Sequence, residues 1–153
     1  MTWTRASHRL AILQGVDDAT PRTATGGCLC GAVRYEARRP LRDVVNCHCG
    51  RCRRTHGHFA AYTEVAAADL ALVQDEGLRW YVADGRERGF CRECGASVFW
   101  RRRDERNISV AAGTLDEPTG LRTVAHIFVD SKGDYYDLAD DVPRFGASRN
   151  TAP

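Results

Sequence analysis

Residues 90–100 read Phe-Cys-Arg-Glu-Cys-Gly-Ala-Ser-Val-Phe-Trp, and this stretch indicates what kind of fold the chain adopts. Two thiols, Cys91 and Cys94, flank a tight turn, and Gly95 lets the backbone take a positive φ without steric cost. The apolar run that begins at Ser97 is typical of a strand. A redox C-x-x-C motif normally opens a helix instead, so metal binding is the better interpretation and redox exchange the alternative.

A second turn of this kind occurs far upstream, where residues 28–31 read Cys-Leu-Cys-Gly and lead into another candidate strand. Pairing the two turns gives four thiolates around one Zn²⁺, a closed tetrahedral sphere with no room for substrate. Such a site would staple two distant strands and contribute folding free energy on the order of 10 kcal/mol. The predicted ligands of this structural zinc are Cys28, Cys30, Cys91 and Cys94.

A third motif, residues 47–52, reads Cys-His-Cys-Gly-Arg-Cys and contributes three thiolates. Three protein ligands and one open position are the arrangement in which zinc does chemistry rather than holding a fold. We therefore expect Cys47, Cys49 and Cys52 to hold a second, catalytic zinc, which makes two zinc ions per chain. His48 is an alternative fourth ligand, but its two neighbours already point inward, so its side chain should point elsewhere.

Basic side chains accompany the third motif. Three thiolates on one Zn²⁺ leave a net charge of about −1, which nearby cations would moderate. The forked guanidinium groups of Arg51, Arg53 and Arg54 suit carboxylates such as those of glutathione, so we expect these arginines to bind substrate. The alternative interpretation is that these three arginines belong to a solvated loop and bind no substrate. His56 and His58 are expected to be solvated or hydrogen-bonded surface histidines, with an approach to the site as the other possibility.

The composition bounds the class of protein. With 153 residues, 43% of them hydrophobic, the chain suits one domain with its own core. We read residues 1–25 as a peripheral arm and residues 26–153 as the zinc-binding domain. The formal net charge is +2, which argues against a large nucleic-acid footprint. No apolar run approaches the roughly 18 residues of a membrane span, so no membrane partner is expected.

The compartment follows from the cysteines and the N-terminus. Disulfides are the alternative use of seven cysteines, but the count is odd and no secretory context supports them. The N-terminal residues lack the apolar core of a signal peptide. A cytoplasmic location, where thiols stay reduced, is therefore expected.

The pattern between the cysteine motifs is that of a mostly β, antiparallel domain. Short runs rich in Val, Ile, Phe, Tyr and Trp alternate with turn residues. The predicted strands include the Val33–Tyr35 stretch and residues 59–64, 70–73, 78–82, 97–101, 108–111 and 123–129. Brief helices are predicted after Cys49 and at the 66–70 corner, and a helical turn at residues 10–13. The Arg101-Arg102-Arg103 run is read as an exposed strand end that Asp104 and Glu105 neutralise.

These motifs together resemble a known family. The stretches at residues 27–36, 47–54 and 90–100, extended by 113–116 and 126–129, are similar to the glutathione-dependent formaldehyde-activating enzyme family, to which centromere protein V is related. The likeness covers residues 26–145 and includes all seven cysteines. Where relatives tend to carry serine after the Arg-Arg pair this chain has Thr55, and Tyr135 and Tyr136 occupy late aromatic positions often held by tryptophan.

The resemblance implies a fold and an activity. The fold would be of the Mss4-like or β-tent type, with antiparallel sheets stapled by zinc. The reaction would be that of a carbon–sulfur lyase acting on S-(hydroxymethyl)glutathione, with glutathione and formaldehyde as its components. Two alternatives remain open from the residues themselves. One is a zinc-stabilised module that binds protein or nucleic acid, and the other is a redox or metal-sensing protein.

Overall fold

The computed structural model describes residues 23–149, so the helical turn predicted at residues 10–13 and nearly all of the predicted arm lie outside the described residues. The described part contains eleven strands and one α-helix, α1 (Gly50–His56). The strands are β1 (Thr23–Gly27), β2 (Arg34–Arg38), β3 (Val44–Cys47), β4 (Ala60–Ala66), β5 (Leu70–Gln74), β6 (Leu78–Ala83), β7 (Arg86–Cys91), β8 (Ser97–Arg102), β9 (Asn107–Ala111), β10 (Thr123–Ile127) and β11 (Arg144–Phe145). Three 3-10 turns complete the described elements, at Ala67–Asp69, Ala112–Thr114 and Val129–Ser131.

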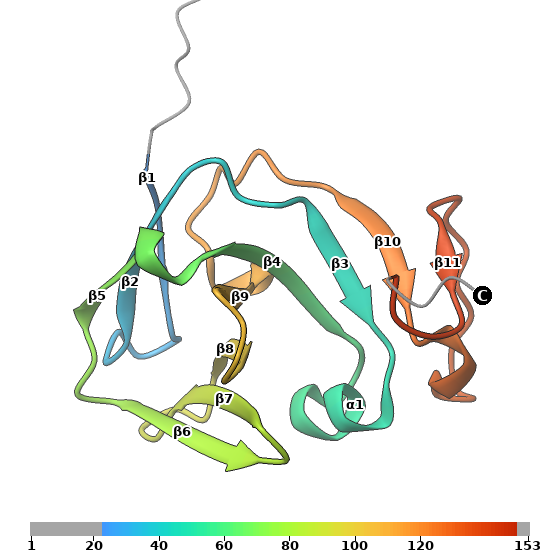
Figure 1. Ribbon diagram of the computed structural model, residues 1–153, viewed down its shortest axis with the longest axis horizontal. Helices are drawn as coiled ribbons and strands as arrows, with labels where there is room; N and C mark the ends of the chain where they lie inside the picture. The colour runs from blue at the N-terminus through green and yellow to red at the C-terminus, as the bar shows by residue number, and fades with distance from the viewer. Residues whose placement is uncertain (1–22, 150–153) are drawn as a thin grey trace, which may run out of the picture.

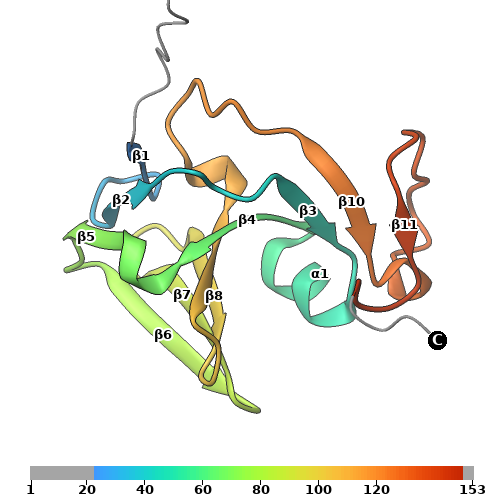
Figure 2. The ribbon, with the colours of Figure 1, turned by 45° about the horizontal axis from the view of Figure 1, so that its top comes forward.

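The strands form two sheets. The smaller sheet has the antiparallel order β1-β2-β5, and the larger has the order β11-β10-β3-β4-β9-β8-β7-β6. Figure 1 shows the larger sheet curving from β11 at the right to β6 at the lower edge, with β1, β2 and β5 gathered at the other end. Helix α1 lies inside this curve, and the turned view of Figure 2 places it below β3 and β4. The last part of the third cysteine motif, Gly50 to Cys52, therefore lies on the concave side of the sheet.

Most neighbouring strands are antiparallel, as predicted, but β10 runs parallel to both β3 and β11. Parallel pairing needs a long crossover, and here the chain passes through α1 and six further strands before it returns beside β3. This pairing sets His126 beside Asn46 and Ile127 beside Cys47. It thereby brings the end of β10 next to the cysteine-rich turn.

The main core lies under the cysteine turns, between the smaller sheet and β8 and β9. Phe99 is 1% exposed, and its ring meets the edge of Tyr35 at 5.2 Å and stacks with Trp80 at 6.0 Å between centroids. Aliphatic side chains such as Val33 and Val98 fill the same cluster, which also contains Cys28 and Cys91. The four-cysteine group is thus continuous with the apolar core.

The strand predictions were confirmed for seven of the strands, and the helix predicted after Cys49 is α1. The 66–70 corner forms a single 3-10 turn. β1, β3, β7 and β11 were not predicted. β3 is buried at Val44, Val45 and Asn46, so it lacks the alternation that marks a half-exposed strand. β1 begins at Thr23, ahead of residue 26 where the domain was expected to start.

Replacement of Phe99 by alanine should lower the free energy of unfolding by about 3 to 5 kcal/mol, because it removes a buried ring from between two aromatic neighbours. Urea denaturation followed by circular dichroism measures the change. Tyr81→Ala is the control, since Tyr81 is 59% exposed on β6, and it should cost less than about 1 kcal/mol. Equal losses in the two variants would contradict this description of the core.

Candidate metal centres

Four thiols converge from the two distant turns. The sulfur atoms of Cys28, Cys30, Cys91 and Cys94 all lie within 4.8 Å of one another. The Cys28–Cys30 and Cys30–Cys91 sulfur distances are 3.6 and 3.7 Å. A tetrahedron with zinc–sulfur bonds of about 2.3 Å has edges of about 3.8 Å, whereas a disulfide bond measures about 2.0 Å. The residues present therefore fit one Zn²⁺ with a full set of thiolate ligands.

The local backbone explains why the four thiols meet. Gly31 and Gly95 follow the second cysteine of each turn and have φ values of +84° and +75°, and the positive φ of Gly95 was predicted from the sequence. The amide of Val33 donates to the Cys28 sulfur at 3.3 Å, and the amide of Cys91 donates to the Ala96 carbonyl oxygen at 2.9 Å. Hydrogen bonds therefore hold each turn as a hairpin-like loop, and the two loops bring their four sulfur atoms together.

A second group of three thiols forms at the start of α1. The sulfurs of Cys47, Cys49 and Cys52 lie within 4.8 Å of one another, and no fourth Cys, His or carboxylate of residues 23–149 joins them. Cys47 ends β3, Cys49 caps α1, and the amide of Cys52 donates to the Cys49 sulfur at 3.4 Å. Hydrogen bonds from Cys47 and Cys52 lower the pKa of the Cys49 thiol far below its usual range. The group is built to hold a thiolate and suits a zinc ion with an open position.

One wall of this three-thiol group was not foreseen from the sequence. Tyr62 lies directly across from Ala111 on the sheet face that also carries Cys47, and it packs with Cys52. The Tyr62 hydroxyl and Nε2 of His56 are 2.9 Å apart. Trp100 packs against the same cluster. An apolar wall with one hydroxyl and one imidazole therefore borders the thiols.

The hydrogen-bonded pair in this wall stays uncharged at neutral pH. Burial raises the pKa of Tyr62, so its hydroxyl remains protonated. Burial, reinforced by the positive charge of Arg88, lowers the pKa of His56, so its ring remains neutral. A neutral imidazole and a phenol can exchange donor and acceptor roles toward a ligand. His56, expected at the surface, is instead part of the wall.

His48 points away from the thiols, as the sequence predicted. Its Nδ1 lies 2.6 Å from the Tyr136 hydroxyl and its Nε2 lies 2.8 Å from Nδ1 of His126. His126 pairs with Asn46 across the sheet. The side chains of Asn46 and Cys47 point to opposite faces of β3, so His126 lies on the face away from the Cys47 thiol. Burial, together with the neighbouring His126, lowers the pKa of His48 to about 4. His48 is therefore a neutral, fully buried ring behind the turn that carries Cys47 and Cys49.

The three candidate substrate arginines differ in their partners. Arg51 forms a 2.6 Å ion pair with Asp84, which ties α1 to the turn between β6 and β7. Nε of Arg53 donates to the carbonyl oxygen of Ser131 at 3.1 Å. Arg54 is exposed, and its side chain makes no hydrogen bond or ion pair with another residue of the described range. Arg54 alone among the three has its guanidinium free.

His58 follows α1 and belongs to an aromatic group rather than to the thiols. Its Nδ1 is 2.9 Å from the Tyr135 hydroxyl, and its ring packs on Phe59 at 4.4 Å between centroids. The structure thus gives His58 the surface hydrogen bond that the sequence favoured. The cysteine spacing did not indicate Tyr62 or the contact of His126 with His48, because no local spacing links these residues to the cysteines.

The two cysteine groups should respond differently to mutation. Cys94→Ser opens a group joined to the main core and should lower the free energy of unfolding by at least about 4 kcal/mol. Cys52→Ser should cost about 1 kcal/mol and remove only the more weakly held metal. Urea denaturation and elemental analysis measure both effects, with wild type expected to carry up to two zinc ions. Equal destabilisation by the two substitutions would show that the roles are wrongly divided.

Known proteins resemble this chain in sequence and in fold. A protein of Schizosaccharomyces pombe, named as an uncharacterized lyase, is 25% identical over 123 residues, which are 78% of this chain and 88% of the yeast protein. A crystal structure of a Rhodobacter sphaeroides protein superposes with a TM-score of 0.52 at 25% identity, covering 78% of this chain and 98% of the other.

The family model of the glutathione-dependent formaldehyde-activating enzyme matches residues 23–131. The matched range includes all seven cysteines and both groups into which the structure gathers them. Since the match covers more than half of the chain, the protein belongs to the glutathione-dependent formaldehyde-activating enzyme family.

Proposed function

We propose that the protein is a zinc-dependent carbon–sulfur lyase acting on an adduct of a small thiol and an aldehyde, such as S-(hydroxymethyl)glutathione. Family membership and the lyase-named yeast relative support a glutathione-related, lyase-type function at the family level. The observation that carries the finer proposal is the group of three convergent thiols, Cys47, Cys49 and Cys52, beside a wall with a buried phenol and an imidazole.

The donor set supports zinc at this group. Thiolates are the soft ligands that zinc accepts, and three of them leave one position for a substrate atom. When bound, zinc would supply a Lewis acid that favours the thiolate form of a thiol or polarises an aldehyde oxygen. The four-thiol group has no open position, so Cys28, Cys30, Cys91 and Cys94 would hold a structural ion.

The side chains of the wall beside the three thiols would bind the hydroxyl oxygen of the substrate. Cleavage of a hemithioacetal breaks its carbon–sulfur bond, forms the aldehyde carbonyl and releases the hydroxyl proton. Tyr62 and His56 form the hydrogen-bonded pair beside the thiols, so we assign them the hydrogen bond to that hydroxyl. Trp100 and Ala111 provide apolar surface that excludes water from the same side.

The arginines of α1 would bind the carboxylates of the thiol. Arg54 is suited to a direct ionic contact because its guanidinium is uncommitted, while Arg51 and Arg53 already bind protein acceptors. Arg53 lies on the same short helix as Cys52, so a thiol that reaches the cysteines keeps its carboxylates near these cations. A forked guanidinium bound to a carboxylate adds both energy and orientation.

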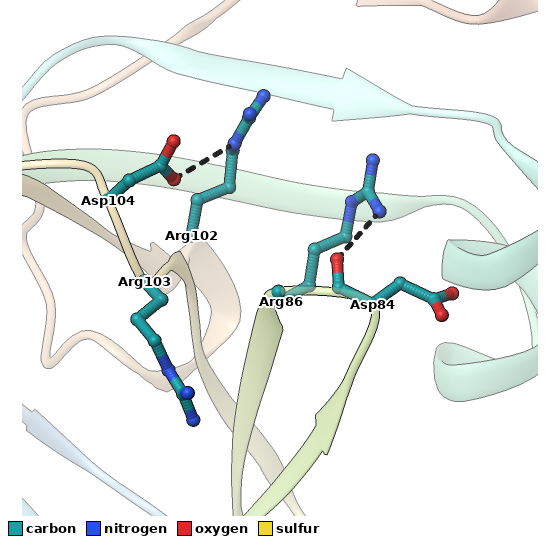
Figure 3. A pocket seen from close by; sticks show the side chains of 6 residues that line it. Asp84, Arg86, Arg102, Arg103 and Asp104 are labelled. Carbon is teal, nitrogen blue, oxygen red and sulfur yellow. Dashed lines mark hydrogen bonds and ion pairs between the residues drawn. The ribbon is translucent and has the colours of Figure 1, made fainter.

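The binding-module alternative receives less support from the charges. Glu87 pairs with both Arg101 and Arg103, and Arg102 pairs with Asp104 and Glu105. Figure 3 shows an open hollow lined by Asp84, Gly85, Arg86, Arg102, Arg103 and Asp104, where acidic groups lie among the guanidinium groups. Phosphate binding favours cations without such partners.

The described residues include no helix that is both long and apolar enough to cross a membrane.

Arg54→Ala should weaken glutathione binding to the zinc-loaded protein by about 1 to 3 kcal/mol, because it removes one charge-assisted hydrogen bond. Binding of 2-mercaptoethanol, which has no carboxylate, should not change. Isothermal titration calorimetry measures both ligands. Arg38→Ala is the matched control, since Arg38 is an exposed arginine of the smaller sheet. If zinc-loaded wild type binds neither thiol, the lyase proposal fails.

Tyr62→Phe should lower turnover of S-(hydroxymethyl)glutathione by about three- to tenfold, the cost of one hydrogen bond in the wall. Zinc content and the affinity for glutathione should stay at wild-type values, since the ring and the thiols remain in place. Steady-state kinetics and elemental analysis test the two statements. Unchanged turnover would remove Tyr62 and its partner His56 from the reaction.

A further inference from the structure

A continuous line of hydrogen bonds runs behind the three-thiol group. It begins at the Tyr136 hydroxyl, which is 2.6 Å from Nδ1 of His48, and passes from Nε2 of His48 to Nδ1 of His126 over 2.8 Å. It ends at Asp140, whose carboxylate oxygens are 2.9 and 3.1 Å from Nε2 of His126. Every nitrogen of the two rings therefore has a side-chain partner. We call these four residues the relay.

The relay is buried in the middle and reaches solvent at one end. His48 is 0% exposed and His126 is 2% exposed, whereas the side chain of Asp140 is 49% exposed. The rings of Phe59 and Tyr136 pack on His48 at centroid distances of 5.0 and 5.7 Å. Buried polar groups are costly unless paired, so this arrangement fixes the rotamers of both imidazoles.

The carboxylate sets the direction of the hydrogen bonds. An ionised carboxylate only accepts, so Nε2 of His126 must donate to Asp140. With both rings neutral, Nδ1 of His126 then accepts from His48, and Nδ1 of His48 accepts from the Tyr136 hydroxyl. One exposed acid thereby selects the tautomer of two buried rings. The same logic orients histidines around metal sites in other proteins.

We propose that the relay is a positioning device for the three-thiol centre: Asp140, His126 and Tyr136 lock His48, and His48 holds Cys47 and Cys49 in the geometry that binds metal. The inference rests on the proposed zinc binding at this centre. It concerns residues that touch neither the thiols nor the wall formed by Tyr62 and Trp100.

The relay can position Cys47 and Cys49 because both are covalently joined to His48. His48 is the single residue between Cys47 and Cys49, so a fixed ring fixes the Cα positions on both sides of it. Its amide also donates to the carbonyl oxygen of Ile127 at 2.9 Å. The turn is thus held through its backbone and through its one side chain that points away from the thiols. Cys52, placed by α1, supplies the third thiol independently.

Cobalt binding tests the proposal without relying on activity. Apoprotein is titrated with Co²⁺ in competition with a chelator, and the thiolate charge-transfer and d–d bands report the affinity and geometry of each centre. Asp140→Asn and Tyr136→Phe should weaken the less tightly bound Co²⁺ by about tenfold or more and alter its d–d bands. The tightly bound ion of the four-thiol centre should be unaffected. Asp140→Glu should restore most of the affinity, because it keeps the accepting carboxylate.

Matched controls are available on the same loop. Asp137→Asn removes a fully exposed carboxylate, and Tyr135→Phe removes a hydroxyl that bonds to His58 instead of His48. Both controls should bind two Co²⁺ ions like wild type. Equal weakening at both centres, or equal weakening in the controls, would overturn the proposal, since the relay would then serve only general stability.

The outcomes also separate this inference from the proposed function. If wild type binds no second Co²⁺, the three-thiol group does not bind metal. Both the lyase proposal and the role proposed for the relay then fail. If wild type binds two ions and Asp140→Asn binds them equally well, only the relay is refuted. Long-range ¹⁵N–¹H spectra of the histidines give a direct check, since wild type should show a proton on Nε2 of His126, hydrogen-bonded to the Asp140 carboxylate. A wild-type His126 ring protonated on Nδ1 alone would contradict the direction assigned to the hydrogen bonds.

Discussion

The convergence of four thiols from two distant turns is the constraint on which the rest of the structure depends. Cys28 and Cys91 are part of the main apolar core, so the thiol group and the packing of Phe99 and Tyr35 stabilise the same region. This junction fastens the smaller sheet to the hairpin of β7 and β8. The larger sheet can then curve away from a fixed end and present its concave side to α1 (Figure 2).

A second group of thiols lies elsewhere on the curved sheet and is assembled in a different way. The three thiols of Cys47, Cys49 and Cys52 are gathered by a strand end and a single short helix rather than by two knuckle turns. This leaves one side of the group to other elements of the sheet, which supply Tyr62 and Trp100. The four-thiol group and the three-thiol group therefore lie at different places in the fold, which suits the different roles proposed for them.

Local spacing accounts for the parts of the protein that the sequence alone predicted. Thiols two or three residues apart, followed by Gly31 or Gly95, define the turns because neighbouring side chains must converge there. Strands such as β8 and β9 are visible through their β-branched and aromatic residues. β3 escaped prediction because it has only four residues and runs directly into the cysteine motif, and β7 because a charged residue, Glu87, takes a buried position where Arg101 and Arg103 neutralise it.

The amino-acid sequence by itself determined the cysteine motifs, the mostly β class and the family, because each of these can be read from short stretches of the chain. Only the tertiary structure decided what surrounds the three-thiol group. The parallel pairing of β3 with β10 brings His126 to His48, and the loop beyond β10 adds Tyr136 and Asp140. Such contacts join residues far apart in sequence, and their register is set by long-range packing, which no local pattern encodes.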